Sequence, residues 1–265
     1  MRTHLVATLL LSTLLSMLAA AQLDAAVKTE AVTYDQAGTV LQGFLAWDDT
    51  ATGQRPGVLV VHEWMGHNEH ARNQAKRLAE AGYVGFALDM YGDGKVATHP
   101  GDAQKFMSEA MSQPEVMKER FLAARALLAG NPHVNPDHIG AIGYCFGGGV
   151  VLAMARQSVD LDLVATFHGS LGTGQKAAPG SVKPRVLVLH GGADPMIPPA
   201  QVDAFRQEMT AAGADFEVVV YENAKHSFTN PDADQAGMPA LAYDAETDRA
   251  SWQRLLEDLA EVFPR

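Results

Sequence analysis

The chain has 265 residues and a net charge of −11, because 20 Lys and Arg stand against 31 Asp and Glu. This length accommodates one large domain with a substantial core or two small ones. The acidic balance argues against nucleic acid or an anionic membrane as a partner, because clustered Lys and Arg bind both.

Residues 1–21 have the pattern of a secretory signal peptide. Arg2 supplies a positive start, residues 5–18 are an apolar stretch, and three alanines at 19–21 suit cleavage. The apolar stretch is shorter than the roughly 20 residues that a membrane span needs, so cleavage is favoured over retention as an anchor. We therefore predict an exported protein, periplasmic in a bacterium, whose residues 22–265 form a single domain.

Short apolar runs of β-type residues alternate with longer amphipathic runs through the rest of the chain. Continuously apolar runs such as RVLVLH and FEVVVY indicate a parallel sheet covered on both faces. The predicted fold class is α/β, with a mostly parallel, doubly wound sheet, helices on both faces and an N-terminal antiparallel hairpin. Strands are predicted over residues 27–34, 40–47, 58–63, 83–90, 138–145, 163–168, 185–190 and 216–221. Helices are predicted over residues 68–81, 102–111, 114–129, 148–157, 199–212 and 240–263.

The segment VLVVHEWMGHNEHA, residues 58–71, is close to the H-E-x-x-H signature of zinc proteases. That signature needs histidines four apart, so that both lie on one helical face and share a metal ion. His62 and His67 are five apart, which rotates the second imidazole by roughly 140° from the first. No metal site is expected, and His62, His67 and His70 are each expected to be hydrogen-bonded or on the surface. Glu63 is expected to end a buried strand, as a functional carboxylate or as a solvated loop residue.

Cys145 is the only cysteine of the sequence and lies in GYCFGGG, where a predicted strand turns directly into a helix. The spacing Gly143-x-Cys145-x-Gly147 is that of a nucleophile elbow, because side chains two before and two after the nucleophile would collide with neighbouring elements. The helix that follows aims its N-terminal amides at the turn, which favours a thiolate and an oxyanion there. The alternatives are a buried small hydrophobic residue and a phosphate-binding turn, although the motifs of known phosphate-binding loops are absent.

A nucleophile elbow predicts an acid and then a histidine later in the chain. Asp194 follows the strand RVLVLH, and His226 follows the strand FEVVVY. Ligands bind beyond the carboxyl ends of the strands in sheets of this type, and Cys145, Asp194 and His226 are all predicted to lie there. Asp194 alone could be a turn former and His226 alone a surface residue, but their shared order and placement favour a Cys-His-Asp triad.

The segments GYCFGGG, HGGADPMIP and HSFTNPDAD together resemble the dienelactone hydrolase family, the cysteine branch of the α/β-hydrolase superfamily. The resemblance covers about residues 27–263 and implies an α/β-hydrolase fold. It implies that Cys145 is the nucleophile, that His226 is the general base and later the acid, and that Asp194 orients His226.

The same resemblance implies roles for residues around the thiol. Glu63 corresponds to a family carboxylate that can sit beside the thiol and take its proton when substrate arrives. The backbone N–H groups of Trp64 and Phe146 would form the oxyanion hole, where losing one donor typically costs about 3 kcal/mol of barrier. No cofactor is implied.

Two positions depart from the family pattern. Family members that act on dienelactone hold its carboxylate with two arginines, one just after an Asp-x-Tyr motif and one four residues beyond the histidine. Gly92 follows that motif here, in LDMYGDGK, and Asn230 stands four residues beyond His226. Neither supplies a bidentate guanidinium contact, and Lys95 would substitute only as a point charge. The sequence therefore predicts ester-cleaving chemistry on a substrate other than dienelactone.

The expected activity is the hydrolysis of carboxylic esters or lactones through a thioacyl-enzyme. One alternative is a binding or redox-responsive protein that has lost turnover, since an accessible thiol in an oxidising compartment is easily oxidised. Another is acyl transfer to an alcohol or amine. The expected partner is a small ester or lactone, with no nucleic acid, no metal or cofactor and no stable membrane insertion after signal cleavage. A monomer or a homodimer is expected.

Overall fold

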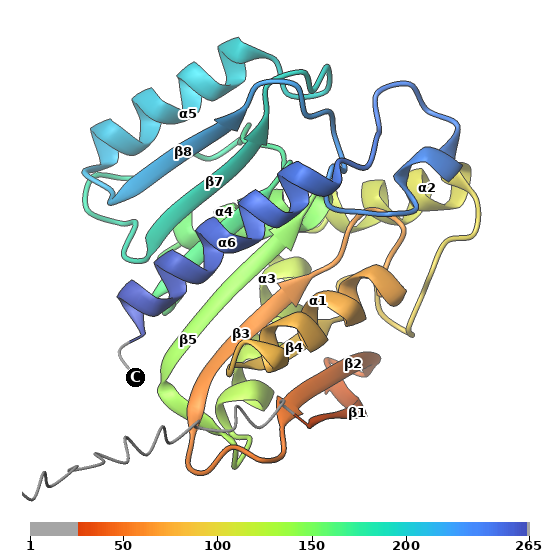
Figure 1. The fold of residues 1–265 in the computed structure, drawn as a ribbon, viewed down its shortest axis with the longest axis vertical. Coiled ribbons are helices and arrows are strands. Elements are labelled where there is room, and N and C mark those ends of the chain that lie inside the picture. Colours follow the sequence, from red (N-terminus) through yellow and green to blue (C-terminus); the bar gives the residue numbers. More distant parts are fainter. Residues whose placement is uncertain (1–25, 264–265) are drawn as a thin grey trace, which may run out of the picture.

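The computed structural model describes residues 26–263, which are built around one eight-stranded sheet (Figure 1). The strand order is β1-β2-β4-β3-β5-β6-β7-β8. β2 pairs antiparallel with both β1 and β4, and every other neighbouring pair is parallel. The predicted mostly parallel sheet with an N-terminal antiparallel hairpin is confirmed. The strands are β1 (Val27–Gln36), β2 (Thr39–Asp48), β3 (Arg55–Val61), β4 (Val84–Leu88), β5 (Val134–Tyr144), β6 (Leu163–Phe167), β7 (Arg185–Gly191) and β8 (Phe216–Tyr221).

Helices cover both faces of the sheet, as the doubly wound prediction requires (Figure 1). α1 and α6 contribute to the core on one face, whereas α3, α4 and α5 contribute to the core on the other, and α2 contacts α3. A short 3₁₀ helix, η1 (Ala233–Ala236), was not predicted. The α-helices are α1 (Glu69–Glu80), α2 (Pro100–Met111), α3 (Pro114–Ala129), α4 (Phe146–Arg156), α5 (Pro199–Ala212) and α6 (Ala245–Val262).

The apolar strands contribute side chains to the hydrophobic cores on both faces of the sheet. In β3, Val58 and Val60 join the core with α1 and α6, whereas Leu59 and Val61 join the core with α3, α4 and α5. All four side chains are fully buried. Because successive side chains of a strand point to opposite faces, an uninterrupted apolar run is what a sheet covered on both sides needs.

Two boundaries near the predicted site differ from expectation. β3 ends at Val61, so Glu63 lies in the loop after the strand rather than at its last position. α4 begins at Phe146, directly after Cys145, and not at residue 148. The strand-to-helix turn is therefore as short as a nucleophile elbow requires.

The last helix also starts later than predicted. α6 begins at Ala245 rather than at residue 240, with Asp244 accepting hydrogen bonds from the first-turn amides. The segment before it is extended, because His226 exchanges backbone hydrogen bonds with Ala240 and Ala242. This tertiary pairing overrides the helical pattern of the sequence and ties the loop of His226 to the chain before α6.

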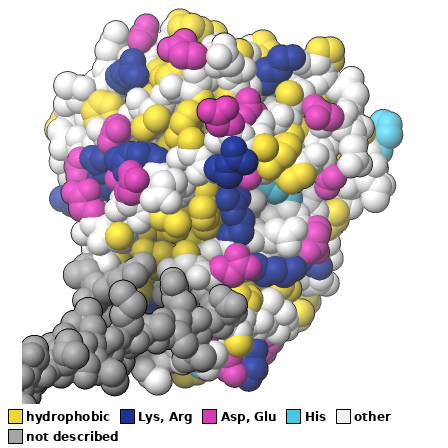
Figure 2. All heavy atoms as spheres, in the orientation of Figure 1, with side chains coloured by type: hydrophobic (Ala, Val, Ile, Leu, Met, Phe, Trp, Pro, Cys, Tyr) yellow, Lys and Arg dark blue, Asp and Glu magenta, His cyan; other side chains and the backbone are white. Residues whose placement is uncertain are grey.

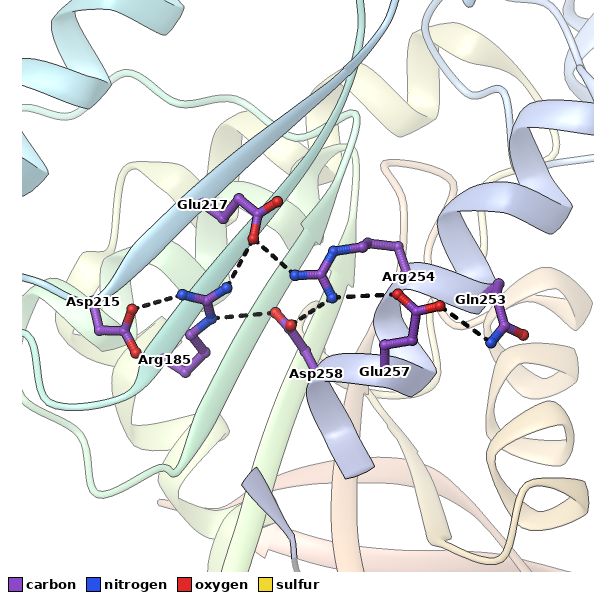
Figure 3. A network of polar contacts seen from close by, with 7 residues as sticks. All are labelled: Arg185, Asp215, Glu217, Gln253, Arg254, Glu257 and Asp258. Carbon is purple, nitrogen blue, oxygen red and sulfur yellow. Dashed lines mark hydrogen bonds and ion pairs between the residues drawn. The ribbon is translucent and has the colours of Figure 1, made fainter. Parts of the chain in front are cut away.

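A network of polar side chains joins the starts of β7 and β8 to α6 (Figure 3). Arg185 pairs with Asp258 at 3.3 Å, and Arg254 pairs with the same carboxylate at 2.6 Å. Both arginines also contact Glu217, at 2.9 and 2.8 Å. We call this set the Arg185–Arg254 network; its members are Arg185, Asp215, Glu217, Gln253, Arg254, Glu257 and Asp258.

On the face shown in Figure 2, acidic and basic side chains are interspersed, with apolar side chains between them. Within residues 26–263, no helix has the length and apolar character needed to cross a membrane. The predicted signal peptide, residues 1–21, lies outside the described residues.

Candidate active site

Cys145 lies at the sharp turn between β5 and α4. Its backbone has φ 51° and ψ −114°, and a positive φ of this kind costs a non-glycine residue about 1–3 kcal/mol. A Cβ atom at Gly143 would overlap the carbonyl oxygen of Gly147, and one at Gly147 would overlap the carbonyl oxygen of Val61. The predicted reason for both glycines is confirmed, and the turn lies directly against the end of β3.

Two backbone amides near this turn are unengaged. Phe146 is the first residue of α4, and N–H groups in a first turn have no partner within the helix. Neither Phe146 nor Trp64 donates a backbone hydrogen bond within the described loops and helix caps. Trp64 is held from its other side, because the Tyr91 hydroxyl donates to its carbonyl oxygen at 2.9 Å. Both amides are thus free for the predicted oxyanion hole.

Asp194 and His226 come together beyond the carboxyl ends of β7 and β8. The Nδ1 of His226 donates to Oδ2 of Asp194 at 2.7 Å, and Oδ1 of Asp194 accepts from the Met196 backbone N–H at 2.8 Å. Both side chains are buried. This pairing fixes the orientation of the ring and leaves Nε2 as the nitrogen available for chemistry.

Nε2 is the ring nitrogen of His226 that remains available to Cys145. Nε2 is buried and has no oxygen or nitrogen partner among the described residues. Burial lowers the pKa of His226, but the coulombic interaction with Cys145 and the hydrogen bond to Asp194 outweigh burial and raise the pKa to about 10. A proton on His226 is therefore stabilised by its interactions with Asp194 and Cys145. The structure thus brings together the three residues that the sequence predicted to meet.

His168 forms one wall of this cluster and was not anticipated from the sequence. Its ring lies edge-on to that of His226, with centroids 5.1 Å apart, and its Nε2 meets Oγ1 of Thr229 at 2.9 Å. Burial keeps the pKa of His168 well below its ordinary value, so the neighbour of His226 is uncharged. The signal was its position at the carboxyl end of a predicted strand.

The Asp-x-Tyr motif stabilises the loop after β4 through hydrogen bonds to backbone N–H groups. Asp89 is fully buried and accepts backbone N–H groups of Tyr91, Gly92 and Gly94 at 2.8 to 2.9 Å. The Tyr91 ring then lies 5.4 Å from that of Phe146, centroid to centroid. The motif therefore sets the position of Tyr91, which in turn holds the Trp64 carbonyl. The Asp89 carboxylate therefore organises this loop and is itself fully buried.

Glu63 is buried, and both of its carboxylate oxygens accept hydrogen bonds. Ser227 donates through Oγ at 3.0 Å and Asn230 donates through Nδ2 at 2.6 Å. Within residues 26–263 the carboxylate makes no hydrogen bond to Cys145, so its expected role beside the thiol stays a prediction. Asn230 occupies one of the two positions that depart from the family pattern, where an uncharged amide now holds Glu63.

The three histidines flanking Glu63 are buried. The Nδ1 of His62 donates to the Glu63 carbonyl oxygen at 2.6 Å, and its Nε2 accepts from the Met90 N–H at 3.2 Å. His67 and His70 are 2% and 8% exposed, which excludes the surface interpretation. Burial lowers the pKa of all three, that of His67 to about 4. Within the described residues no three His, Cys, Asp or Glu side chains are arranged to hold a metal ion.

A cavity of about 450 Å³ adjoins this cluster. Glu63 and Trp64 line it from the loop after β3, and Ser227, the chain neighbour of His226 and hydrogen-bonded to Glu63, lines it from the loop after β8. The rest of the wall comes from the start of α1, from Thr98 and Pro100, and from residues within 230–241. A small molecule held there would lie beside the loops that carry His226 and the Trp64 amide.

The arrangement of strands and helices is that of the α/β-hydrolase fold. A solved structure named m3DLH is similar with a TM-score of 0.86 and 36% identity, covering 90% of this chain and 99% of that one. A second is the crystal structure of a dienelactone hydrolase-like promiscuous phosphotriesterase from metagenomic libraries. Its TM-score is 0.86 and its identity 34%, covering 89% of this chain and 99% of that one.

Comparison of sequences identifies the family within this class. The model of the dienelactone hydrolase family matches residues 41–263. A carboxymethylenebutenolidase-like protein of Yersinia pestis is 30% identical over 232 residues, which is 83% of each chain. The chain belongs to the dienelactone hydrolase family, and it is a dienelactone hydrolase-like hydrolase.

Proposed function

We propose that the protein hydrolyses carboxylic esters or lactones through a Cys145–His226–Asp194 triad and a thioacyl-enzyme. The observation that carries this proposal is the orientation of His226, with Nδ1 bound to Asp194 and Nε2 left to the thiol at the strained turn. A buried imidazole oriented by a carboxylate and facing a nucleophile is the arrangement of a catalytic triad.

In the acylation step, the Cys145 thiolate attacks the carbonyl carbon and a carbon–sulfur bond forms. The oxyanion that results accepts hydrogen bonds from the unengaged N–H groups of Phe146 and Trp64. Protonated His226 then gives its Nε2 proton to the departing alkoxide as the carbon–oxygen bond breaks. Asp194 keeps the ring in place and stabilises its positive charge before that transfer.

In the deacylation step, neutral His226 takes a proton from water, and the hydroxide attacks the thioester carbonyl. The carbon–sulfur bond breaks, the acid leaves, and the thiolate is restored beside protonated His226. The same nitrogen thus acts first as an acid and then as a base, which requires that it have no other permanent partner.

Glu63 has a proposed role as the proton acceptor of Cys145 when substrate arrives. It would take the proton of the resting thiol, which gives the thiolate that attacks, and return that proton to the thiolate released in deacylation. Its two hydrogen bonds, from Ser227 and Asn230, hold the carboxylate away from that role in the structure described here. Substrate entering the adjoining cavity would have to displace at least one of them. We expect Glu63→Gln to lower the rate of acylation, measured in single-turnover experiments, with little effect on deacylation.

Detection of the acyl-enzyme tests the mechanism. Incubation with para-nitrophenyl acetate and rapid acid quenching should leave one acetyl group on the peptide that contains Cys145, identified by mass spectrometry. Turnover without any acylated thiol, or full turnover by a protein whose Cys145 is alkylated with iodoacetamide, would refute the thioacyl route. Adding an alcohol or amine as a competing nucleophile distinguishes hydrolysis from acyl transfer, because transfer would give a new ester or amide.

We also propose that the chain is exported, with cleavage near Ala21 and a periplasmic location in a bacterium. The support is the charge and apolar pattern of residues 1–21. N-terminal sequencing of the protein from a periplasmic fraction should begin close to residue 22; an intact Met1 in the cytoplasmic fraction would contradict export. Sedimentation of the same material would distinguish the proposed monomer from the proposed homodimer.

A further inference from the structure

The cavity beside the candidate active site is lined by carboxylates and by no basic side chain of fixed charge. Glu63, Glu69 and Asp232 contribute to its wall, and no Lys or Arg does so within the described residues. Glu69 pairs with Lys76 at 3.1 Å, but this lysine lies outside the wall, and both side chains are solvent-exposed. Lys76 therefore partly offsets the charge of Glu69, whereas Glu63 and Asp232 have no ion-pair partner among the described residues.

His70 is the only other titratable group in this wall. It is 8% exposed, and its Nε2 is buried with no hydrogen-bond partner among the described residues. Burial lowers the pKa of His70 although Glu63 and Asp232 raise it, so the ring is neutral at neutral pH. The ring lines the cavity but adds no positive charge to its wall.

Asn230 adds no positive charge to the wall of this cavity. It stands where family members that bind an anionic substrate carry an arginine, and its amide donates to Glu63 at 2.6 Å. An amide satisfies the carboxylate oxygen without cancelling its charge. The substrate side of Glu63 is therefore negative, and a substrate carboxylate placed there would meet repulsion and no guanidinium.

We infer that the enzyme selects esters whose remote end is cationic, such as a quaternary ammonium group, over neutral isosteres, and rejects esters whose remote end is a carboxylate. This inference rests on the proposed hydrolase function and specifies its substrate class. Three carboxylates, of which only Glu69 has a cationic partner, attract a positive group and repel a negative one, and no Lys or Arg among the described residues lines the cavity.

The expected size of the effect follows from Coulomb's law. Each solvated carboxylate about 7 Å from the charged end contributes roughly threefold to kcat/KM in a water-like dielectric. Together they give a cationic ester an advantage on the order of tenfold over its neutral isostere, and the anionic ester a comparable disadvantage. The advantage should shrink with added salt, because mobile ions screen charges near the surface.

The test uses matched ester series with the full mature chain. One series has para-nitrophenyl esters whose acid chain ends in a trimethylammonium group, an isosteric tert-butyl group or a carboxylate. The other places the same three groups on the alcohol. We expect kcat/KM to fall in the order cationic, neutral, anionic in at least one series. An anionic ester that is cleaved as well as its cationic counterpart in both series would overturn the inference.

A double variant, Glu69→Gln with Asp232→Asn, removes two of the three carboxylates while leaving Glu63 in place. It should reduce severalfold the ratio of kcat/KM on the cationic ester to kcat/KM on the neutral isostere. The matched control is Glu80→Gln with Asp203→Asn, which removes two exposed carboxylates that lie outside the cavity wall. Equal loss of preference in both double variants would assign the effect to net charge and overturn the cavity as its cause.

The hydrolase function and the charge preference can be rejected independently. Cys145-dependent cleavage of the neutral isostere supports the hydrolase function whatever the charge preference is. No cleavage of any ester in either series by folded protein would reject the proposed function itself. Cleavage of the neutral ester with no preference between charged ones would reject only the selection by charge.

Discussion

The two ends of strands β7 and β8 carry charge in opposite ways. At their amino ends, the arginines of the Arg185–Arg254 network each contact three carboxylates within 4 Å (Figure 3). At their carboxyl ends, Asp194 and His226 form one 2.7 Å pair, and the outer nitrogen of the imidazole has no oxygen or nitrogen partner. One end satisfies its charged groups with each other, whereas the other leaves reactive atoms available for a substrate.

The difference separates groups that hold the fold from groups that can react. Glu217 has a lowered pKa, chiefly because Arg254 donates a hydrogen bond to it, and this carboxylate therefore stays ionised within its network. His226 has a raised pKa because its interactions with Cys145 and Asp194 outweigh its burial. Changes at the network should therefore alter stability, and changes at the site should alter turnover.

The largest expected effect is that of Cys145→Ala on turnover. Hydrolysis of a small activated ester should fall by about 10⁴-fold or more, because the nucleophile is lost. The free energy of unfolding, measured by urea denaturation, should fall by only about 1 kcal/mol, because one sulfur atom packed against the core and beside His226 is lost. A variant that unfolds at much lower urea would show that Cys145 also supports the fold and would weaken the comparison.

Asp194→Asn should lower kcat by about 10³-fold, since the amide does not hold the required tautomer of His226. It should also change the pH profile. His226 keeps its proton below a pKa of about 10, so the acid needed for leaving-group departure is lost as pH rises through that value. Removing the Asp194 charge lowers this pKa, and the alkaline limb of residual activity should move to lower pH. An unshifted limb would mean that Asp194 does not act on His226.

As pH falls, the region around the candidate active site should lose stability before the Arg185–Arg254 network does. His67 titrates near 4 in the fold and near 6.5 when unfolded, so its contribution is complete above pH 6.5 and is lost as pH falls toward 4. The loss amounts to about 3 kcal/mol for a group buried to this extent. The stability contribution of His226 has the opposite pH dependence. Its raised pKa contributes stability that is complete below pH 6.5 and is lost as pH rises through about 10.

Urea denaturation at stepped pH, with hydrogen exchange to locate the opening, measures this effect. Amides around α1 and the loop after β3 should lose protection first between pH 6.5 and 4. Glu217 has a lowered pKa, so its contribution is present above its ordinary range and is lost only at lower pH. Simultaneous loss at both ends would indicate that the two regions do not respond independently.

The smallest effect is expected within the network. Asp258 is 1% exposed and contacts both arginines, so Asp258→Asn should lower the free energy of unfolding by about 2 kcal/mol while ester hydrolysis stays unchanged. Lys105→Met is the control, because its pair with Glu109 is exposed and 3.9 Å long. That control should change stability by less than about 0.5 kcal/mol. Lost turnover in folded Asp258→Asn protein would contradict the separation of the two ends.

The sequence predicted those parts of the molecule that depend on local geometry. The elbow at Cys145 was predictable because glycine spacing reports directly on steric exclusion, and both glycines are required as expected. Asp194 and His226 were predictable because parallel strands place their carboxyl ends at one edge of the sheet. The apolar strands likewise indicated a sheet covered on both faces before any contact was known.

Contacts between distant segments were not predictable in the same way. Ser227 and Asn230 bind Glu63 across 164 and 167 residues of chain, and no local pattern encodes such a pairing. His67 and His70 have an ordinary loop and helix context, yet tertiary packing buries them. α6 starts late because the loop of His226 pairs with the chain that precedes it, which propensity alone does not register.

The positive φ of Cys145 affects which residues position 145 can accept during evolution. Glycine adopts such a backbone without penalty, so replacing the cysteine with glycine would relieve the turn and make the inert protein slightly more stable. Folding alone therefore gives no reason to retain a thiol at this position. In any lineage that ceases to need the reaction, residue 145 should be among the first to become glycine.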